Sequence, residues 1–561
     1  MVKSQVLAAL DGQKVSWFHF KAIIIAGMGF FNDSYDLFTI GLLTKLIGRI
    51  YYTPRCPLNT VCPTSFYGKK PGALPINQNS AITAVALCGT LAGQIFFGWL
   101  GDKIGRKTAY GVTLITMVVF GVGQAMSFGT TPLAVVTTLC ICRFMLGVGI
   151  GGDYPLSAVI MSEYANKATR GAFVAAVFSM QGIGILVGAA ITLAVAGGLR
   201  HSHPRAPFSV DPYGSIGLPA SDFAWRLVLA LGAVPAALTF YYRLQLPETA
   251  RYTSIVAGDA AGTAANMARV LETDFTAEDA AIEGGAKLQG AYDPAAVETY
   301  TFAQGWGMPR HVPPSQQNWG WFLKWHGWHL IGTTSTWFFL DIAFYSQNLF
   351  QSNVFSIIGW VPKNTTMSAL TEAYKLARAQ ALVALWSTVP GYYFTVFTVD
   401  IIGRWWIQVG GFFMMTLFMG ILAGDYNNLK TKKGPFVALY SLCFFFANWG
   451  PNATTFIVPA EIFPAKFRST AHGISAACGK AGAIVGAFGF LYASQDKNPA
   501  VSAPYPAGIG LQNALIVLTV ANFMGLICTI VFVPESKGMS LEDFEGEVDV
   551  KPAKLNGETK V

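Results

Sequence analysis

Ionisable side chains lie inside several long apolar stretches of this sequence. Residues 143–163, RFMLGVGIGGDYPLSAVIMSE, have the length and apolarity of a membrane-spanning helix, yet Asp153 lies deep inside them. An ionised side chain near the bilayer centre costs at least ~3 kcal/mol, and such residues mark ion pathways, proton relays or substrate contacts. Further ionisable residues within apolar stretches include Asp33, Asp36, Arg143, Asp341 and Lys480. The chemistry we expect from them is transport across a membrane.

The composition agrees with a polytopic membrane protein. Of the 561 residues, 53% are hydrophobic and only 12% are charged, whereas soluble domains carry about 25% charged residues. The net charge of +8 fits loops beside anionic lipid rather than nucleic-acid binding. No nucleophile–base pair or metal cluster stands out, and the eight cysteines form no metal pattern, so we expect neither an enzyme nor a cofactor.

Twelve stretches are long enough to span a bilayer, which takes ~20 mostly apolar residues. The predicted fold is therefore all-α. The expected spans are 21–48, 80–100, 108–127, 132–160, 171–197, 223–243, 326–351, 380–399, 405–424, 435–458, 470–493 and 509–533. They predict a six-helix bundle at 1–245, a polar linker or small helical insert at 246–325, a second six-helix bundle at 326–533 and a polar, disordered tail at 534–561.

Two motifs recur in both halves of the chain. A DxxGR motif follows the second and the eighth span, and a Glu and an Arg flank the turn after the fourth and the tenth span. Both motifs repeat at the same offset of 298 residues, which predicts two related bundles in pseudo-symmetry. We expect gating or structural ion pairs from these residues, which are Asp102, Arg106, Glu163, Arg170, Asp400, Arg404, Glu461 and Arg468.

The same loops predict the orientation in the membrane. Basic residues gather in the short loops of both repeats, which places those loops, both termini and the central linker in the cytoplasm. Loop 49–78 is also basic, which would place it in the cytoplasm instead. We rely on the repeated motifs as the stronger indication of orientation. Asn364 would then lie on the outer side in a glycosylation sequon, and both a glycosylated and an unmodified loop stay open. Cys56 and Cys62 share one outer loop, where a disulfide is an open alternative.

Polar residues at helical spacing suggest a ligand site. Trp337, Asp341 and Tyr345 follow at i, i+4 and i+8, along one helical stripe. Single aromatic residues also form interfacial belts, and buried charges also pair to hold helices together. Arg143, for instance, would pair with Asp36 in a structural or gating bridge. The further polar candidates within spans are Tyr154, Gln181 and Asn448.

The segment GVGIGG, Gly147 to Gly152, matches GxGxxG. A dinucleotide fold is excluded, because no strand precedes the segment and it lies inside a span. Close packing of helices through small residues is the better interpretation.

Further stretches make a family recognisable. GGDYPLSA at 151–158 resembles the signature of the phosphate:proton symporters of the major facilitator superfamily. The resemblance covers essentially all twelve spans and is closest to the plant high-affinity phosphate transporters. It also rests on GMGFFNDSYDLF (27–38), WFFLDIAFYSQNLF (337–350), the run from NWGPNATTF (448–456) to 490, and PESKGMSLEDFE (534–545).

The resemblance implies a role for each matching position. Lys480 matches a cationic position near the phosphate site, and Asp36 and Asp153 match carboxylates assigned to proton coupling, which the neighbouring Asp33 would share. Arg143 matches an arginine that interacts with the first helix. The implied phosphate contacts are Tyr154, Gln181, Trp337, Asp341, Tyr345 and Asn448.

The expected function is proton-coupled uptake of inorganic phosphate across the plasma membrane by alternating access. Dihydrogen phosphate donates and accepts hydrogen bonds, so an ionised Asp341 accepts from it and repels sulfate, while arsenate should compete. Two alternatives stay open: a sugar or organic-solute porter of the same superfamily, and a nutrient receptor with little flux. Affinity, proton stoichiometry and oligomeric state do not follow from the sequence.

Overall fold

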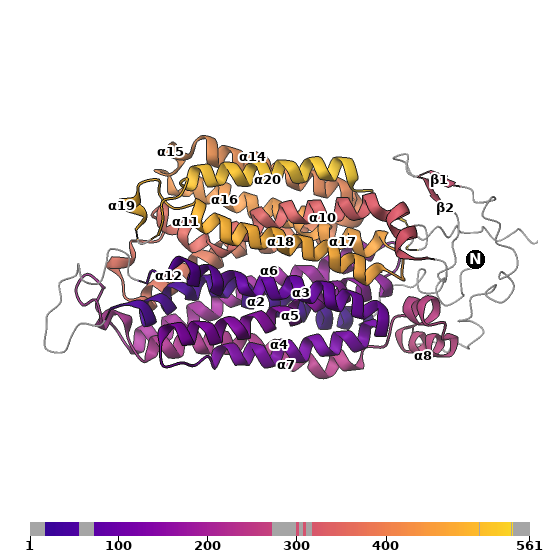
Figure 1. Ribbon diagram of the computed structural model, residues 1–561, viewed down its shortest axis with the longest axis horizontal. Helices are drawn as coiled ribbons and strands as arrows, with labels where there is room; N and C mark the ends of the chain where they lie inside the picture. The colour runs from indigo at the N-terminus through magenta and orange to yellow at the C-terminus, as the bar shows by residue number, and fades with distance from the viewer. Residues whose placement is uncertain are drawn as a thin grey trace, which may run out of the picture.

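The computed structural model describes residues 17–54, 72–271, 299–301, 307–309, 317–503, 505–539 and 541. Its long helices run side by side in two layers (Figure 1). One layer holds α2 (Trp17–Tyr52), α3 (Ile76–Ile104), α4 (Arg106–Ala125), α5 (Pro132–Tyr164), α6 (Arg170–Ser202) and α7 (Ala220–Gln245). We call these six helices the N-half.

The second layer, which we call the C-half, contains the remaining long helices (Figure 1). They are α10 (Trp319–Leu349), α12 (Ala369–Val383) continuing through η7 (Ala384–Thr388) into α13 (Val389–Ile402), α14 (Arg404–Gly424), α16 (Lys433–Asn448) followed by α17 (Pro451–Ile462), α18 (Arg468–Ala493) and α20 (Leu511–Phe532). The described part of the chain thus has the expected architecture of two groups of six long helical segments.

Shorter elements connect these helices. Between the halves lie the π-helical turn η3 (Tyr252–Val256), α8 (Ala260–Leu271) and a two-stranded antiparallel ladder of β1 (Thr299–Thr301) and β2 (Gly307–Pro309). The C-half adds α11 (Gln351–Ile357), η6 (Asn364–Thr366), α15 (Tyr426–Leu429) and α19 (Pro499–Ser502), and η2 (Gly214–Ile216) precedes α7. Helix α10 begins before the expected 326, because the Asn318 side chain caps it by accepting from Trp321 N–H.

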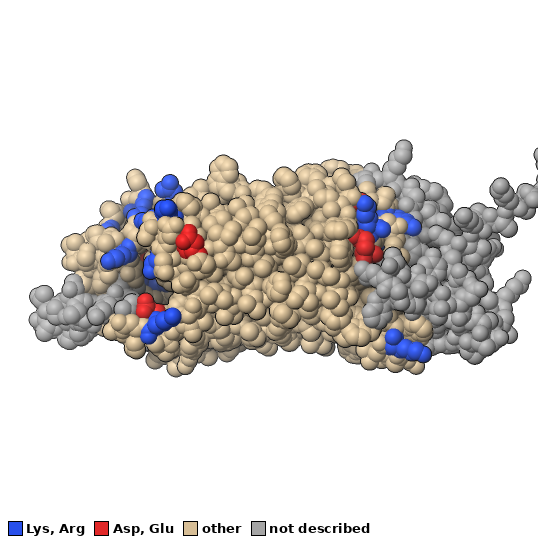
Figure 2. All heavy atoms as spheres, turned by 90° about the horizontal axis from the view of Figure 1, so that it is seen from above, with Lys and Arg blue, Asp and Glu red and all other residues tan. Residues whose placement is uncertain are grey.

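On the face shown in Figure 2, charged side chains gather towards the two ends of the molecule, and uncharged residues cover the middle. By length and composition, nine helical segments among the described residues could span a membrane. The other three spans are α2, α10 and the broken pair α16–α17. Two of these carry the acidic residues predicted for the site, Asp33, Asp36 and Asp341.

Two glycine pairs explain how the elements fit. Gly105 and Gly403 of the DxxGR motifs have φ of 96° and 111°, a left-handed conformation that favours glycine, and they turn the chain between adjacent helices. Within GVGIGG, a side chain at Gly147 would overlap the Ala86 carbonyl of α3, and one at Gly151 would overlap the Thr90 carbonyl. Close packing is therefore confirmed as the reason for these glycines.

Two sequence expectations are wrong in detail. The tenth span is not one helix: α16 ends at Asn448, and α17 restarts at Pro451, where a missing N–H costs nothing. The tail is not wholly disordered, because Glu535 accepts hydrogen bonds from Arg404 N–H and Trp405 N–H at the start of α14. Ser536 Oγ also donates to Glu461 at 2.6 Å.

Candidate functional site

A buried ion pair lies at the contact between the two halves. Lys480 Nζ of α18 lies 3.0 Å from Asp341 Oδ2 of α10. Two tyrosine rings flank the ammonium group, with centroids 4.9 Å away for Tyr154 of α5 and 4.5 Å away for Tyr345 of α10. All four residues are buried. The structure therefore brings a cation, a carboxylate and two phenols from both halves into one dry cluster, which we call the central site.

The N-half contributes a hydrogen-bonded row to this central site. Tyr154 Oη donates to Asp33 Oδ2 of α2 at 2.6 Å, and Gln181 Nε2 of α6 donates to Tyr154 Oη at 3.4 Å. These contacts join three helices that the sequence separates by up to 148 positions. Asp33 is therefore the acidic residue of α2 that reaches the site.

The row continues into the C-half through two residues that the sequence did not single out. Tyr392 Oη of α13 donates to Gln181 Oε1, and Asn452 Nδ2 of α17 donates to Tyr392 Oη at 2.7 Å. Asn452 also donates to Asn448 Oδ1 at 2.8 Å. The break between α16 and α17 places both asparagines on this row, so Asn448 reaches the site through Asn452.

Trp337 closes one wall of the central site. Its ring meets Phe456 and His472 edge-on, with centroid distances of 6.4 Å and 5.6 Å. Gly479 leaves room for the indole, because a Cβ there would lie 2.5 Å from its Cδ1 atom. All seven residues predicted to contact substrate are thus buried around one region.

Several buried polar atoms of this region have no hydrogen-bond partner. They include the Tyr345 hydroxyl, Asp33 Oδ1 and Nδ1 of His472 beside Trp337. Leaving a buried polar group unpaired costs about 1–3 kcal/mol. The central site therefore retains unused hydrogen-bonding capacity from each half, as a site for a small polar ligand would.

Asp36 and Arg143 do not form the expected direct pair. Gln124 of α4 lies between them: its Nε2 donates to Asp36 Oδ1 at 2.7 Å, and its Oε1 accepts from Arg143 Nη1 at 3.3 Å. Arg143 Nε donates instead to the Ile82 carbonyl at 2.8 Å. An amide can bridge them because it donates to the carboxylate and accepts from the guanidinium at once.

Asp153 has a partner that the sequence did not indicate. Arg243, near the end of α7, donates two hydrogen bonds to it, from Nη1 to Oδ1 at 2.5 Å and from Nη2 to Oδ2 at 3.2 Å. The guanidinium also lies over the Tyr110 ring, 3.9 Å from its centroid. Both charged groups are buried. Asp153 is therefore separate from the Tyr154 row, although the two residues are neighbours in sequence.

The repeated motifs meet at one end of the molecule, which we call the DxxGR end. Each DxxGR motif keeps its internal ion pair, Arg106–Asp102 at 3.3 Å and Arg404–Asp400 at 2.8 Å. The glutamates differ from the expectation. Glu163 pairs with Arg468 of the other half at 2.9 Å and lies 3.7 Å from Arg106.

The remaining motif residues have other partners. Glu461 pairs with Arg404 at 2.7 Å. Arg170 donates to the Met539 carbonyl at 3.1 Å. The tail thus takes part in closing the DxxGR end.

Each DxxGR aspartate also caps a helix of the opposite half. Asp102 accepts from Ser469 N–H and Thr470 N–H at the start of α18, at 3.3 Å and 2.7 Å. Asp400 accepts from Gly171 N–H and Ala172 N–H at the start of α6, at 3.2 Å and 2.8 Å. Helix N-termini favour negative charge, so these contacts hold the DxxGR end closed.

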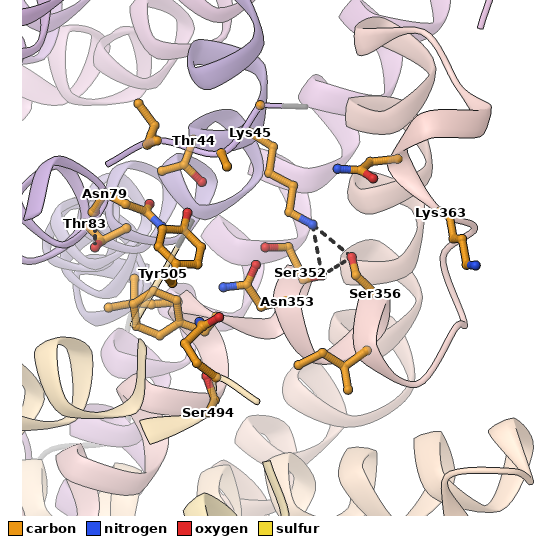
Figure 3. A pocket seen from close by; sticks show the side chains of 18 of the residues that line it. Thr44, Lys45, Asn79, Thr83, Ser352, Asn353, Ser356, Lys363, Ser494 and Tyr505 are labelled. Atoms are coloured by element: carbon orange, nitrogen blue, oxygen red, sulfur yellow. Dashed lines mark hydrogen bonds between the residues drawn. The ribbon is translucent and has the colours of Figure 1, made fainter. Parts of the chain in front are cut away.

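A second set of contacts closes the opposite end. Arg49 Nη2 of α2 lies 2.6 Å from Glu372 Oε2 of α12. Tyr492 Oη of α18 donates to Asn77 Oδ1 of α3 at 2.9 Å. Contacts between the two halves are therefore present at both ends of the central site. A cavity of about 320 Å³ lies at this second end and not at the central site (Figure 3).

The comparisons with known proteins agree with this geometry. The family model described as sugar (and other) transporter matches residues 21–313 and 377–547. Inorganic phosphate transporter 1-2 of Oryza sativa subsp. japonica is 56% identical over 96% of this chain and 95% of its own length. Probable inorganic phosphate transporter 1-7 of Arabidopsis thaliana is 54% identical over 97% of this chain and 95% of its own length. The chain belongs to the inorganic phosphate transporter 1 family.

The fold is shared more widely. The solved structure of the major facilitator proton:xylose symporter XylE, bound to 6-bromo-6-deoxy-D-glucose, superimposes with a TM-score of 0.67. It is 18% identical and covers 94% of this chain and 98% of its own. Members of this transporter family are membrane transporters rather than enzymes. No group of metal-binding side chains is present in the described part of the chain.

Proposed function

We propose that this chain takes up dihydrogen phosphate together with protons across the plasma membrane, by alternating access. The DxxGR end and both termini face the cytoplasm in this proposal. The observation that carries it is the Lys480–Asp341 pair held between the rings of Tyr154 and Tyr345. The names of the relatives support the same substrate.

The central site matches this substrate group by group. Lys480 supplies a positive charge, and the unpartnered Tyr345 hydroxyl supplies a free donor. Asp341 accepts from a P–OH group, which dihydrogen phosphate offers and sulfate lacks near neutral pH. Sulfate would leave that carboxylate repelled and unpaired, whereas arsenate carries the same hydrogens. We therefore expect arsenate, and not sulfate, to compete.

Asp33 is the carboxylate best placed to load a proton beside the substrate. It has an unpartnered oxygen and contacts Tyr154 of the central site, while Asp153 is held by Arg243. Import of one negative charge into a negative-inside cell costs ~2.3 kcal/mol per 100 mV, and one cotransported proton cancels it. We assign proton coupling to Asp33, with Asp36 and Asp153 as further coupling groups whose partners must exchange during the cycle.

Uptake of labelled phosphate into proteoliposomes tests the proposal. An inward proton gradient should drive accumulation that a protonophore abolishes and that unlabelled arsenate, but not sulfate, reduces. The Asp33→Asn variant should exchange phosphate without concentrating it, and the control Asp222→Asn, at the end away from the DxxGR loops, should accumulate it normally. The fold shared with a xylose symporter makes a sugar the second candidate. Accumulation of a sugar and not phosphate would overturn the proposed substrate.

A further inference from the structure

The cavity at the end opposite the DxxGR loops is polar and positively charged. It lies between α2 of the N-half and the segment from α11 to η6 of the C-half (Figure 3). Among its described lining residues, the charged ones are both lysines, Lys45 and Lys363. The hydroxyl and amide side chains around them include Thr44, Asn79, Ser352, Asn353, Ser356 and Ser494.

The charge of Lys45 is only partly matched. Its Nζ donates to Ser356 Oγ at 2.9 Å and lies 3.9 Å from Glu372 Oε1. That carboxylate is already engaged by Arg49 at 2.6 Å, so two cations share one anion. The excess positive charge lies in the cavity wall, with the Lys45 side chain 21% exposed.

Buried donors complete the wall. The Ser494 hydroxyl is 4% exposed and has no hydrogen-bond partner. Burial raises the pKa of the Tyr505 phenol to about 12 despite its hydrogen bond with Asn79, so the phenol stays protonated at any physiological pH. Donors and unmatched positive charge in one cavity favour an oxyanion over a cation or a neutral solute.

We propose that this cavity is a second binding site for inorganic phosphate, occupied before the ion reaches the central site. Nine positions of α2 separate Lys45 from Asp36, about 13–14 Å along a helix. Leu349 and Phe350 line the cavity. Helix α2 packs tightly there, since a Cβ at Gly41 would lie 2.9 Å from the Leu349 carbonyl. The inference rests on the proposed function, because the same ion occupies both sites.

Stoichiometry separates the two sites. Labelled phosphate is titrated to saturation onto the purified full-length chain. We expect two phosphate ions bound per wild-type chain and one per chain in Asn353→Asp, which adds a negative charge to the cavity wall without changing its shape. Lys45→Gln should behave in the same way. Lys433→Gln, an exposed lysine outside the cavity lining, is the matched control and should still bind two.

Each outcome decides between the two claims. One phosphate ion per wild-type chain, retained in Asn353→Asp and Lys45→Gln, would overturn the second site and leave the proposed function intact. Two ions retained in both variants would overturn it as well. No bound phosphate in any protein would overturn the proposed function. Folding of each variant is checked by its thermal transition and by its elution volume in size-exclusion chromatography. If Lys45→Gln does not fold, the number of phosphate ions bound by Asn353→Asp decides the test.

Discussion

At the scale of single residues, the central site contains a strong pair and an unused hydroxyl. The Lys480–Asp341 pair is complete without substrate, so phosphate must share or displace one partner. The Tyr345 hydroxyl is buried and unpartnered, so a ligand gains a hydrogen bond there without breaking one. A substitution of Tyr345 should therefore change the affinity for phosphate without changing the stability of the fold.

We expect Tyr345→Phe to raise the KM for phosphate about tenfold or more while leaving the melting temperature unchanged. A hydrogen bond to a charged group contributes about 1.5–3 kcal/mol, and the native hydroxyl donates to no acceptor in the empty site. Uptake kinetics and thermal unfolding measure the two effects.

Tyr440→Phe is the matched control, because Tyr440 Oη donates to the Gln347 carbonyl at 2.9 Å. It should lower the melting temperature and leave KM unchanged. Equal KM values in Tyr345→Phe and wild type would show that Tyr345 does not contact phosphate.

The Asp153–Arg243 pair allows a double-mutant cycle. Asp153→Asn or Arg243→Gln alone should destabilise the chain by about 3–5 kcal/mol, because each leaves a buried charge without its partner. The double variant should regain most of that stability, measured by thermal unfolding. It should still fail to accumulate phosphate in proteoliposomes, since no titratable group remains at position 153. Full accumulation by the double variant would make Asp153 purely structural.

The sequence predicted the residues of the site better than their partners. Asp341 and Lys480 were found because an ionisable group in an apolar stretch is conspicuous in any single sequence. Gln124, Tyr392 and Asn452 were missed because polar uncharged residues are common within spans and no spacing marks them. Arg243 was missed because it falls at the end of a predicted span, where a basic residue is ordinary.

At the scale of elements, the two DxxGR loops act on helices that they do not belong to. Asp102 of the N-half caps α18 of the C-half, and Asp400 caps α6 in return. The sequence repeat predicted the motifs and their symmetry. The repeat could not predict that each aspartate caps a helix of the opposite half, because the offset between two motifs does not say which half each side chain faces.

Asp102→Asn should loosen the DxxGR end. Loss of the charge weakens hydrogen bonds to two helix N–H groups, by about 1–2 kcal/mol in total. We expect an about five- to thirtyfold faster reaction of a small thiol reagent with Ser469→Cys, a fully buried position at the start of α18 that faces α3. The charged residue Asp222 pairs with Arg226, and Asp222→Asn should leave the rate unchanged. If Ser469→Cys reacted at the same rate with and without Asp102→Asn, the cap that Asp102 forms on α18 would not help to close this end.

At the scale of the whole molecule, both ends are closed around the central site by contacts of different kinds. The DxxGR end uses paired motifs from both halves, and the opposite end uses Arg49, Lys45 and Glu372. Alternating access requires that only one end opens at a time. Weakening one end should therefore protect the other.

Glu372→Gln should have the opposite effect to Asp102→Asn. It leaves Arg49 and Lys45 facing each other without a carboxylate, so the cavity end opens. The reagent should then react faster with Leu349→Cys at the cavity and more slowly with Ser469→Cys. Lys433→Gln is the control and should change neither rate. Faster reaction at both positions would show loss of packing instead of a shift between two states.

The helices α2 and α10, which carry Asp33, Asp36 and Asp341, are long enough to cross a membrane but are not apolar enough to be recognised as spans by composition. Each Asp, Lys or Arg near the middle of a span opposes insertion by about 2.5–3.5 kcal/mol, and α2 holds Asp33, Asp36 and Lys45. The partners of these carboxylates, Gln124 on α4 and Tyr154 on α5, follow α2 in the chain and are therefore synthesised after it. Biosynthesis of this transporter therefore depends on an insertion machinery that retains α2 until later helices arrive.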